Sequence, residues 1–345
     1  MNDAYLSWQM LTLRLRNPFR LSYGTSETRT AFWLRLAGDA GWGEGTIPPY
    51  YGVSHEAMIA YWQQVAADAR PLPDDPAEIA DWVGTSGPAP ARSGLELALY
   101  DRIARRQGVP LYRLLGLPRP EPLPTSFTIA IDTPERMAEM ALDIEDMPVI
   151  KLKLGSDEQD LDRVAAVRAA RPDAKLRIDA NAGWTVEEAL RFTRALEPYD
   201  LEMIEQPLGR DEFAGMGRVQ AETDIPVVAD ESVQSLADVE ALARAGVRGI
   251  NLKLMKVGGL SKGLLILERA RELGLSVLLG CMIETSIGVT AMAHLTGLAD
   301  WVDLDSPLLI NNDPFDGITY DADACVHVPE RPGIGATLRP GAELS

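Results

Sequence analysis

The feature of this sequence that most restricts its fold is a repeat in the C-terminal part of the chain. Short apolar runs with β character recur there, most of them about 22–28 residues apart, and helix-like stretches such as DLDRVAAVRAARP separate them. The runs end at Ile131, Lys153, Asn181, Glu205, Glu231, Lys256, Glu284 and Asp305. Eight strands that alternate with helices at this spacing predict a parallel (β/α) barrel. The competing fold, a doubly wound open sheet, normally carries a glycine-rich phosphate turn after an early strand, and this sequence has none.

The N-terminal segment follows a different pattern, which predicts a separate α+β domain. The expected elements are antiparallel strands at 10–24 and 30–38, a short strand within the glycine turns of 38–45, and helices at 54–70 and 90–107. Residues 115–124, LGLPRPEPLP, contain four prolines and have the composition of a linker. We therefore expect the barrel to begin after residue 122.

The net charge of the chain excludes several classes of partner. The 345 residues include 33 Lys and Arg against 51 Asp and Glu, a formal charge of −18, which repels nucleic acid and anionic membranes. The sequence contains neither an apolar run near 18 residues nor a basic start followed by an apolar segment, so we expect no membrane span and no secretory signal. The two cysteines, Cys281 and Cys325, allow no disulfide framework or cysteine zinc cluster and fit a cytoplasmic location.

Three acidic residues at predicted strand ends form a candidate metal site. Asp179, Glu205 and Asp230 lie 26 and 25 residues apart on three successive strands, and the C-terminal strand ends of a barrel meet at one mouth. Three hard oxygen ligands without histidine or cysteine suit Mg²⁺. Each carboxylate taken alone could instead cap the following helix. Because all three carboxylates occupy the same position at the ends of successive strands, we favour a metal site over three separate helix caps.

Lysines flank these predicted metal strands on both sides. In VIKLKLG, at 149–155, alternation puts Lys151 and Lys153 on one face of a strand, and Lys253 ends the strand that follows the metal strands. Amines on opposite sides of a bound substrate are what is needed to remove a proton from one face of a carbon and return it to the other. If the strand were exposed, the paired lysines would simply face water.

The lysine that acts as a base needs a lowered pKa. A lysine ordinarily titrates near about 10.4, too high for a base at neutral pH. We expect Lys151 to lower the pKa of Lys153, since a neighbouring cation and partial burial both disfavour the charged form. Of the two lysines in KLMK, Lys253 ends the apolar run, whereas Lys256 precedes VGG and is expected to start the loop.

Together, KLKLG, DANAGW, EQP, ADES and KLMKVGG resemble the strand-end motifs of the enolase superfamily, specifically its muconate-lactonizing subgroup. GWGEG and ELALYDRIARRQGVPLYRLLG resemble the capping domain of that subgroup, so the resemblance covers nearly the whole chain. It implies a (β/α)₇β-type modified TIM barrel over residues 123–315. The α+β cap would be formed by residues 1–122 and completed by the tail at about 316–345. The resemblance also implies a homo-oligomer.

The resemblance assigns roles to the strand-end residues. Asp179, Glu205 and Asp230 would bind one Mg²⁺ per subunit, which stabilises an enolate of the substrate carboxylate. Lys153 and Lys253 would be the opposed acid/base catalysts. CMIET stands where another branch carries a histidine base, so that branch is disfavoured. The remaining histidines are expected to be structural or exposed, and they are His55, His294 and His327.

The motif DLDSP distinguishes among the reactions of the subgroup. Asp303 and Asp305 are similar to the pair with which dipeptide epimerases hold the α-ammonium group of a substrate, and two carboxylates can neutralise one –NH₃⁺. The alternative without a role in binding is that this motif is a strand-end turn that begins with aspartate and proline. We expect a Mg²⁺-dependent dipeptide epimerase acting at the α-carbon of the C-terminal residue of an L,L-dipeptide. N-succinylamino acid racemase and o-succinylbenzoate synthase remain alternatives with the same site, and a non-catalytic binding barrel is an alternative of another class.

The expected substrate contacts come from strand ends and cap loops. They are Asp303, Asp305, Lys151, Tyr23, Tyr50, Cys281 and Glu284, with no role assigned to the last two. Epimerases of the Ala-Glu type are expected to carry an arginine in the first cap loop, where this chain has Gly24. Arg20 and Arg29 remain candidates only if the register of that loop is shifted. We therefore expect an apolar or cationic second residue in the substrate.

Overall fold

An eight-stranded parallel barrel forms the centre of the structure, a computed structural model that describes residues 5–68 and 70–342. The strands are β4 (Phe127–Ile129), β5 (Val149–Lys153), β6 (Lys175–Asp179), β7 (Leu201–Glu205), β8 (Val227–Ala229), β9 (Gly249–Leu252), β10 (Ser276–Gly280) and β11 (Trp301–Asp303). They pair in this order. A parallel bridge between Thr125 and Val302 joins the two ends, which closes the sheet.

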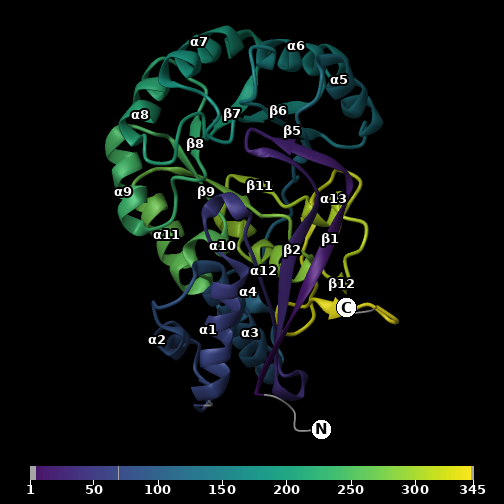
Figure 1. Cartoon of the computed structure of the whole chain (residues 1–345), viewed down its shortest axis with the longest axis vertical. Coiled ribbons are helices and arrows are strands. Elements are labelled where there is room, and N and C mark those ends of the chain that lie inside the picture. The colour runs from purple at the N-terminus through teal and green to yellow at the C-terminus, as the bar shows by residue number, and fades with distance from the viewer. Residues whose placement is uncertain (1–4, 69, 343–345) are drawn as a thin grey trace.

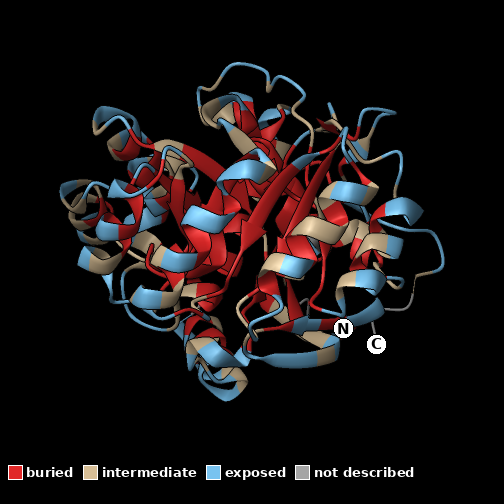
Figure 2. Cartoon of the chain, turned by 90° about the horizontal axis from the view of Figure 1, so that it is seen from above, coloured by how far each residue is buried: buried red, intermediate tan, exposed pale blue. Residues whose placement is uncertain are grey.

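A helix follows each of the first seven barrel strands (Figure 1). These helices are α5 (Pro134–Asp143), α6 (Asp160–Ala170), α7 (Val186–Leu196), α8 (Phe213–Ala221), α9 (Leu236–Ala245), α11 (Leu260–Glu272) and α12 (Ser286–Ala293). Single turns, α10 (Leu254–Val257) and α13 (Ser306–Leu309), follow β9 and β11. Figure 2 shows the strands buried and the outer faces of the helices exposed. The predicted (β/α)₇β barrel is thereby confirmed.

Six of the eight strands leave the sheet two to four residues before the predicted ends. The largest differences are in β9, which ends at Leu252 instead of Lys256, and in β10, which ends at Gly280 instead of Glu284. The reason is that burial continues past the last ladder hydrogen bond. In β8, for example, the ladder stops at Ala229, but Asp230 and Glu231 are buried as well. Buried loop residues at the mouth therefore look like strand in the sequence.

The alternation in β5 separates two buried faces. Ile150 and Leu152 belong to the apolar core that packs under the surrounding helices. Lys151 and Lys153 point the other way, into the barrel, where they are 0% and 7% exposed. A parallel strand that is covered on both faces therefore carries two cations inside the protein. Such burial is costly unless each cation is paired.

The N-terminal residues form a cap beside the barrel. Its antiparallel sheet contains β1 (Leu6–Leu21), β2 (Gly24–Leu36) and β3 (Trp42–Thr46). Its helices are α1 (His55–Asp68), α2 (Ile79–Val83), α3 (Ala89–Gln107) and α4 (Leu111–Leu114). Its short 3-10 turns are η1 (Ala37–Asp39), η2 (Pro49–Tyr51) and η3 (Pro76–Glu78), whereas η4 (Glu197–Tyr199) and η5 (Thr296–Leu298) lie in the barrel. The strands and helices that the sequence predicts for this segment are thus present.

The hairpin of β1 and β2 extends from the cap to the barrel mouth (Figure 1). Near its tip, Ser22 Oγ donates to the backbone oxygen of Asn181 at 2.8 Å, and Ile131 N donates to the oxygen of Arg20 at 3.0 Å. The hairpin therefore forms part of the wall around the mouth.

The C-terminal tail packs back onto the cap. It forms two small antiparallel pairs, β12 (Phe315–Asp316) with β15 (Thr337–Leu338), and β13 (Thr319–Tyr320) with β14 (Val326–His327). Asp101 of α3 accepts a hydrogen bond from Ile334 N at 2.7 Å, and Leu111 N donates to Gly333 O at 2.8 Å. The domain boundaries near residues 122 and 315 stay predictions.

Candidate active site

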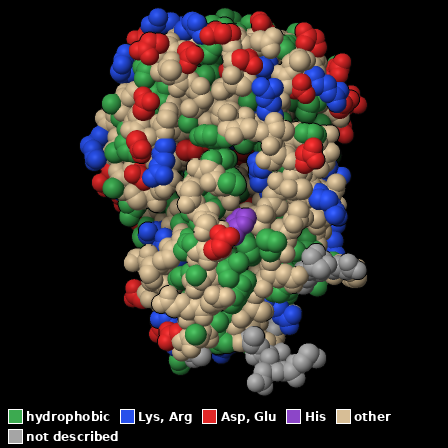
Figure 3. All heavy atoms as spheres, viewed as in Figure 1, with side chains coloured by type: hydrophobic (Ala, Val, Ile, Leu, Met, Phe, Trp, Pro, Cys, Tyr) green, Lys and Arg blue, Asp and Glu red, His purple; other side chains and the backbone are tan. Residues whose placement is uncertain are grey.

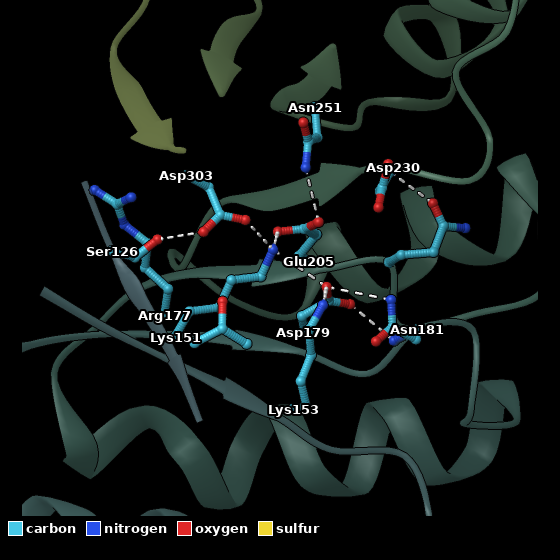
Figure 4. A network of polar contacts seen from close by, with 12 residues as sticks. Ser126, Lys151, Lys153, Arg177, Asp179, Asn181, Glu205, Asp230, Asn251 and Asp303 are labelled. Carbon is cyan, nitrogen blue, oxygen red and sulfur yellow. Dashed lines mark hydrogen bonds and ion pairs between the residues drawn. The ribbon is translucent and has the colours of Figure 1, made fainter. Parts of the chain in front are cut away.

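Three carboxylates converge where β6, β7 and β8 end. Asp179 and Glu205 are the last residues of their strands, and Asp230 directly follows β8. One carboxylate oxygen from each lies within 4.8 Å of the others, and all three side chains are buried. Neighbouring residues hold them in place, since Gln206 Oε1 accepts from Asp230 N at 2.8 Å and Asn251 Nδ2 of β9 donates to Glu205 Oε1 at 2.9 Å (Figure 4). The predicted convergence is therefore present.

The donor set of this triad fits Mg²⁺. It offers hard oxygen atoms at close range, without a nitrogen or sulfur ligand. Burial and the neighbouring Asp179 raise the pKa of Glu205 to about 7. The rise shows that the buried carboxylates of the triad repel one another. Burial would also raise the pKa of Asp230, but Lys253 and Lys256 outweigh it and hold this pKa well below its ordinary value.

The lysines reach the triad from both sides. Lys153 Nζ lies 2.6 Å from Asp179 Oδ2, and Lys253 Nζ lies 2.7 Å from Asp230 Oδ2. The first lysine is on β5 and the second directly follows β9, so they flank the three metal strands. Figure 4 shows Lys151 and Lys153 pointing toward these carboxylates. The two amines thus stand at the two ends of one row of carboxylates.

Lys151 is enclosed by carboxylates. Its Nζ lies 2.7 Å from Glu205 Oε2, 2.8 Å from Asp303 Oδ2 and 3.2 Å from Asp179 Oδ2. Burial lowers its pKa, but the three carboxylates outweigh burial, and the pKa stands well above its ordinary value. Lys151 and Lys153 share Asp179 Oδ2, so they are close enough to interact. The effect of Lys151 on the pKa of Lys153 stays a prediction.

The expectation that Lys256 starts a loop was wrong. This lysine lies in the one-turn helix α10, is 4% exposed, and contacts both Oδ1 and the backbone oxygen of Asp230. It also donates to Asn251 O at 3.0 Å. The signal in the sequence was the i, i+3 spacing of the two lysines in KLMK, because a single turn, closed by Lys256 N donating to Lys253 O at 3.1 Å, brings both to Asp230. Asp230 therefore has two lysine partners.

Asp303 and Asp305 lie on the other side of the mouth. Asp303 already has a cation, because Lys151 contacts its Oδ2 and Ser126 Oγ donates to its Oδ1 at 2.7 Å. Burial raises the pKa of Asp303, but Lys151 and Lys153 lower it to about 2. Asp305 Oδ2 accepts from Thr128 N at 2.7 Å, and burial together with Asp303 raises its pKa to about 7. Asp305 is therefore the carboxyl that lacks a cationic partner among the described residues.

A cleft between barrel and cap joins these groups. Among the predicted site residues, those that line it are Lys153, Lys253, Asp303, Asp305, Cys281 and Tyr50. Tyr23 lies outside this lining and stacks on Tyr50, with the ring centroids 4.2 Å apart. Glu284 is also outside and is buried, accepting a hydrogen bond from Met282 N at 2.8 Å. Arg29, a candidate only for a shifted register of the first cap loop, lines the cleft, and so does Asn181, to which the sequence assigned no role.

Two carboxylates of the cap hold barrel helices that begin beside the cleft. Glu44, from the motif GWGEG, accepts from Thr285 N at 2.8 Å, from Thr285 Oγ1 at 2.6 Å and from Gly288 N at 3.0 Å at the start of α12. Glu96 of α3 accepts from Ser261 N at 2.9 Å at the start of α11. Carboxylates stabilise helix N-termini in this way. The cap therefore fixes the loops that follow β9 and β10.

The histidines lie away from the cleft lining. His294 is buried and its Nε2 contacts Ile334 O at 2.9 Å. His327 is paired with Asp321 at 2.7 Å on the surface, and His55 packs edge-on against Phe32. A mechanism with a histidine base has no candidate here.

Comparison with family models identifies both parts of the chain. Residues 135–342 match the enolase C-terminal domain-like family, and residues 9–116 match the N-terminal domain of the mandelate racemase / muconate lactonizing enzyme family. The chain belongs to the enolase superfamily. The capping domain and the modified TIM barrel expected from the sequence motifs are those of this superfamily.

Relatives within the superfamily act on amino acid derivatives. The L-Ala-D/L-Glu epimerase of Bacillus subtilis is 34% identical, with 94% of each chain covered. A dipeptide epimerase from Cytophaga hutchinsonii, solved with Mg and D-Ala-L-Val, has a TM-score of 0.91 at 30% identity, covering 97% of this chain and 96% of that one. An N-succinyl Arg/Lys racemase from Bacillus cereus has a TM-score of 0.92 at 26% identity, covering 98% and 95%.

The surface of this superfamily member has a mixed charge. On the face shown in Figure 3, acidic and basic side chains are interspersed over the barrel helices. None of the helices in the described part of the chain is long and apolar enough to cross a membrane.

Proposed function

We propose that this protein is a Mg²⁺-dependent dipeptide epimerase, an isomerase that inverts the α-carbon of the C-terminal residue of a dipeptide. The observation that carries the proposal is the position of two lysine amines on the two flanks of one metal site. Lys153 contacts Asp179 at one end of the triad and Lys253 contacts Asp230 at the other. The dipeptide epimerases among the relatives support the choice of substrate class.

The residues at the barrel mouth have different roles in the proposed reaction. Mg²⁺ bound by Asp179, Glu205 and Asp230 supplies Lewis-acid stabilisation of the charge that develops on the substrate carboxylate. Lys153 and Lys253 remove the α-proton from one face and return a proton to the other. Cleft closure by the cap excludes water from this exchange.

The carboxylates near β11 hold the other end of the substrate. Asp305 lines the cleft and lacks a cationic partner among the described residues, so the α-ammonium group of a dipeptide supplies one. Asp303 also lines the cleft, and it keeps Lys151 in place through its ion pair. A buried carboxylate that gains a cation at hydrogen-bond distance is stabilised in its charged form.

The second residue of the substrate faces the cap. Gly24 is the first residue of β2 and offers no side chain, but Arg29 of the same strand lines the cleft. A cationic side chain would meet like charge at Arg29. We therefore revise the expected second residue from apolar or cationic to apolar or acidic.

The direct test is proton exchange in D₂O. The protein with Mg²⁺ is incubated with a pool of L,L-dipeptides and, separately, with a pool of N-succinylamino acids, and mass spectrometry detects the gain of one carbon-bound deuterium. We expect gain in a subset of dipeptides with an apolar or acidic second residue. Absence of exchange in both pools would contradict an epimerase and favour a binding protein.

The alternative reactions use the same lysines and metal. Two observations make N-succinylamino acid racemization the second candidate. Asp303 is already paired with Lys151, and the fold is similar to that of an N-succinyl Arg/Lys racemase. The synthesis of o-succinylbenzoate needs the same lysines and metal. Asp305→Asn separates them, because the amide retains the acceptor for Thr128 N but loses the charge. For a dipeptide epimerase, kcat/KM on dipeptides falls about 10- to 100-fold, the loss expected for one hydrogen bond to a charged group. For the alternative, turnover of the N-succinyl substrate is not reduced.

A further inference from the structure

A second cavity lies directly beside the cleft and has no part in the proton transfer. Apolar side chains from several elements line it, among them Phe19 of β1, Phe127 of β4, Met140 of α5 and Leu308 of α13. Ala130, which follows β4, lies on its wall as well. Arg16 and Asn17 also contribute to the lining, but most of it is apolar, and such a concave site is suited to an apolar group.

An irregularity in β1 creates this cavity. Arg14 pairs with Thr28 and Phe19 with Ser26, so the four residues 15–18 of β1 stand opposite the single residue Glu27 of β2. The bulged segment turns away from β2 toward the chain after β11, where Leu15 bridges to Ile310. Bulges of this kind redirect side chains next to functional sites. The cavity is thus a built feature of the hairpin.

The cavity and the cleft share a wall. Phe19, Thr128 and Leu309 line both of them. Thr128 is also the residue whose backbone N–H bonds to Asp305. The cavity therefore opens beside the carboxyl to which the proposed function assigns the α-ammonium group.

We call the second cavity the side pocket. Its position beside Asp305 indicates which part of the substrate it binds. With its carboxylate at the triad and its ammonium group at Asp305, a dipeptide carries the side chain of its first residue within one bond of the carbon that holds that ammonium group. We propose that the side pocket binds an apolar side chain on the N-terminal residue of the substrate, so that the substrate class is dipeptides with an aliphatic first residue. The inference rests on the proposed function and specifies its substrate.

The test compares dipeptides that differ only at the first residue. With one accepted C-terminal residue kept constant, we expect a first residue of leucine to give at least about tenfold higher kcat/KM for D₂O exchange than alanine, the discrimination that a methylene or more supplies in an apolar pocket. Ala130→Leu fills the side pocket, and it should lower kcat/KM for the leucine substrate at least about tenfold while changing the alanine substrate less than about threefold.

Two variants of α5 form a matched pair that does not depend on filling the pocket. Met140→Ala enlarges the side pocket and should shift the preference toward a larger first residue such as phenylalanine. Met137→Ala makes the same change on the same helix, but Met137 lines neither the side pocket nor the cleft, so it should leave the preference as in the wild type.

The outcomes separate this inference from the proposed function. If wild-type protein exchanges no dipeptide, the proposed function fails. If it exchanges alanine-first dipeptides without a preference for leucine, or if Ala130→Leu and Met140→Ala change both substrates equally, the side pocket is not the subsite and only this inference is overturned.

Discussion

At the scale of single residues, the site is a balance between buried carboxylates and the cations that pair with them. Lys151, Lys153, Lys253 and Lys256 all contact oxygen atoms of the candidate metal ligands. A Mg²⁺ ion held by Asp179, Glu205 and Asp230 would compete with these amines for the carboxylate oxygens. The lysines therefore hold the carboxylates in place, and metal binding would release the amines for proton transfer.

Metal removal should lower the stability of the protein. Because the triad is buried and forms only in the folded chain, Mg²⁺ at about 100 times its Kd adds about 2.7 kcal/mol to the free energy of unfolding. Thermal melts at constant ionic strength, with Mg²⁺ and then with EDTA, measure this effect. Asp230→Asn should abolish most of it, and Asp321→Asn, a change at an exposed carboxyl of the tail, should not. Identical melts with and without the metal would contradict the site.

His294 should make the protein sensitive to acid. Its burial lowers the pKa from 6.5 to about 4, despite the contact with Ile334 O. The unfolded chain takes up the proton below about 6.5, whereas the folded chain does not. The free energy of unfolding should therefore fall between pH 6.5 and 4, by at most about 1.4 kcal/mol per pH unit from this group. Denaturant titrations of wild type and His294→Gln should show a shallower fall in the variant, and equal slopes would refute the assignment.

At the scale of elements, the cap acts on the mouth through helix N-termini. Glu44→Gln removes an acceptor at the start of α12 and should cost about 0.5–2 kcal/mol of stability. The loop before α12 carries Cys281 and Met282 into the cleft, so Glu44→Gln should also raise KM or lower kcat. The assay belongs at pH 8, above the pKa of Glu44, which burial raises to about 7.

A matched control exists at the start of another barrel helix, where no cap residue takes part. Glu188 accepts from Thr185 N at 2.8 Å in the capping box of α7 and is half-buried. Glu188→Gln should lower stability in a similar way while leaving activity unchanged. Equal effects of the two variants on activity would mean that Glu44 is merely a structural cap.

The elements show where prediction from sequence succeeds. The alternation of β5 placed Lys151 and Lys153 on one face because the period of a strand is two, and the structure shows that this face is buried inside the barrel. The triad could be found because the ends of parallel strands meet at one edge, so equal spacing implies proximity. The strand ends were misplaced because burial, which the sequence pattern reports, continues beyond the hydrogen-bonded ladder.

At the scale of the whole molecule, the fold and the barrel half of the site could be predicted, but of the cap half only Tyr50 was both predicted and found in the cleft lining. Arg29 reaches the cleft, and Glu44 reaches the start of α12, only through the docking of one domain on the other, and no local periodicity encodes that docking. The side pocket likewise depends on a bulge in β1 that faces the chain after β11, almost 300 residues away. Contacts of such sequence separation leave no short pattern to detect.

In the proposed mechanism, Lys153 and Lys253 transfer protons on opposite faces of the same substrate α-carbon. The measurement that tests it most directly follows the α-hydrogen of the L,L and the L,D form of one accepted dipeptide in D₂O, with Lys153→Ala and with Lys253→Ala. We expect both variants to lose epimerization by at least about 100-fold, the typical contribution of a general acid or base. Each should still exchange the hydrogen of one form, and the two variants should select different forms. Lys175→Ala, a change at an exposed lysine of β6, should behave as wild type. Epimerization that persists in either active-site variant, or exchange of the same form by both, would contradict the two-base account.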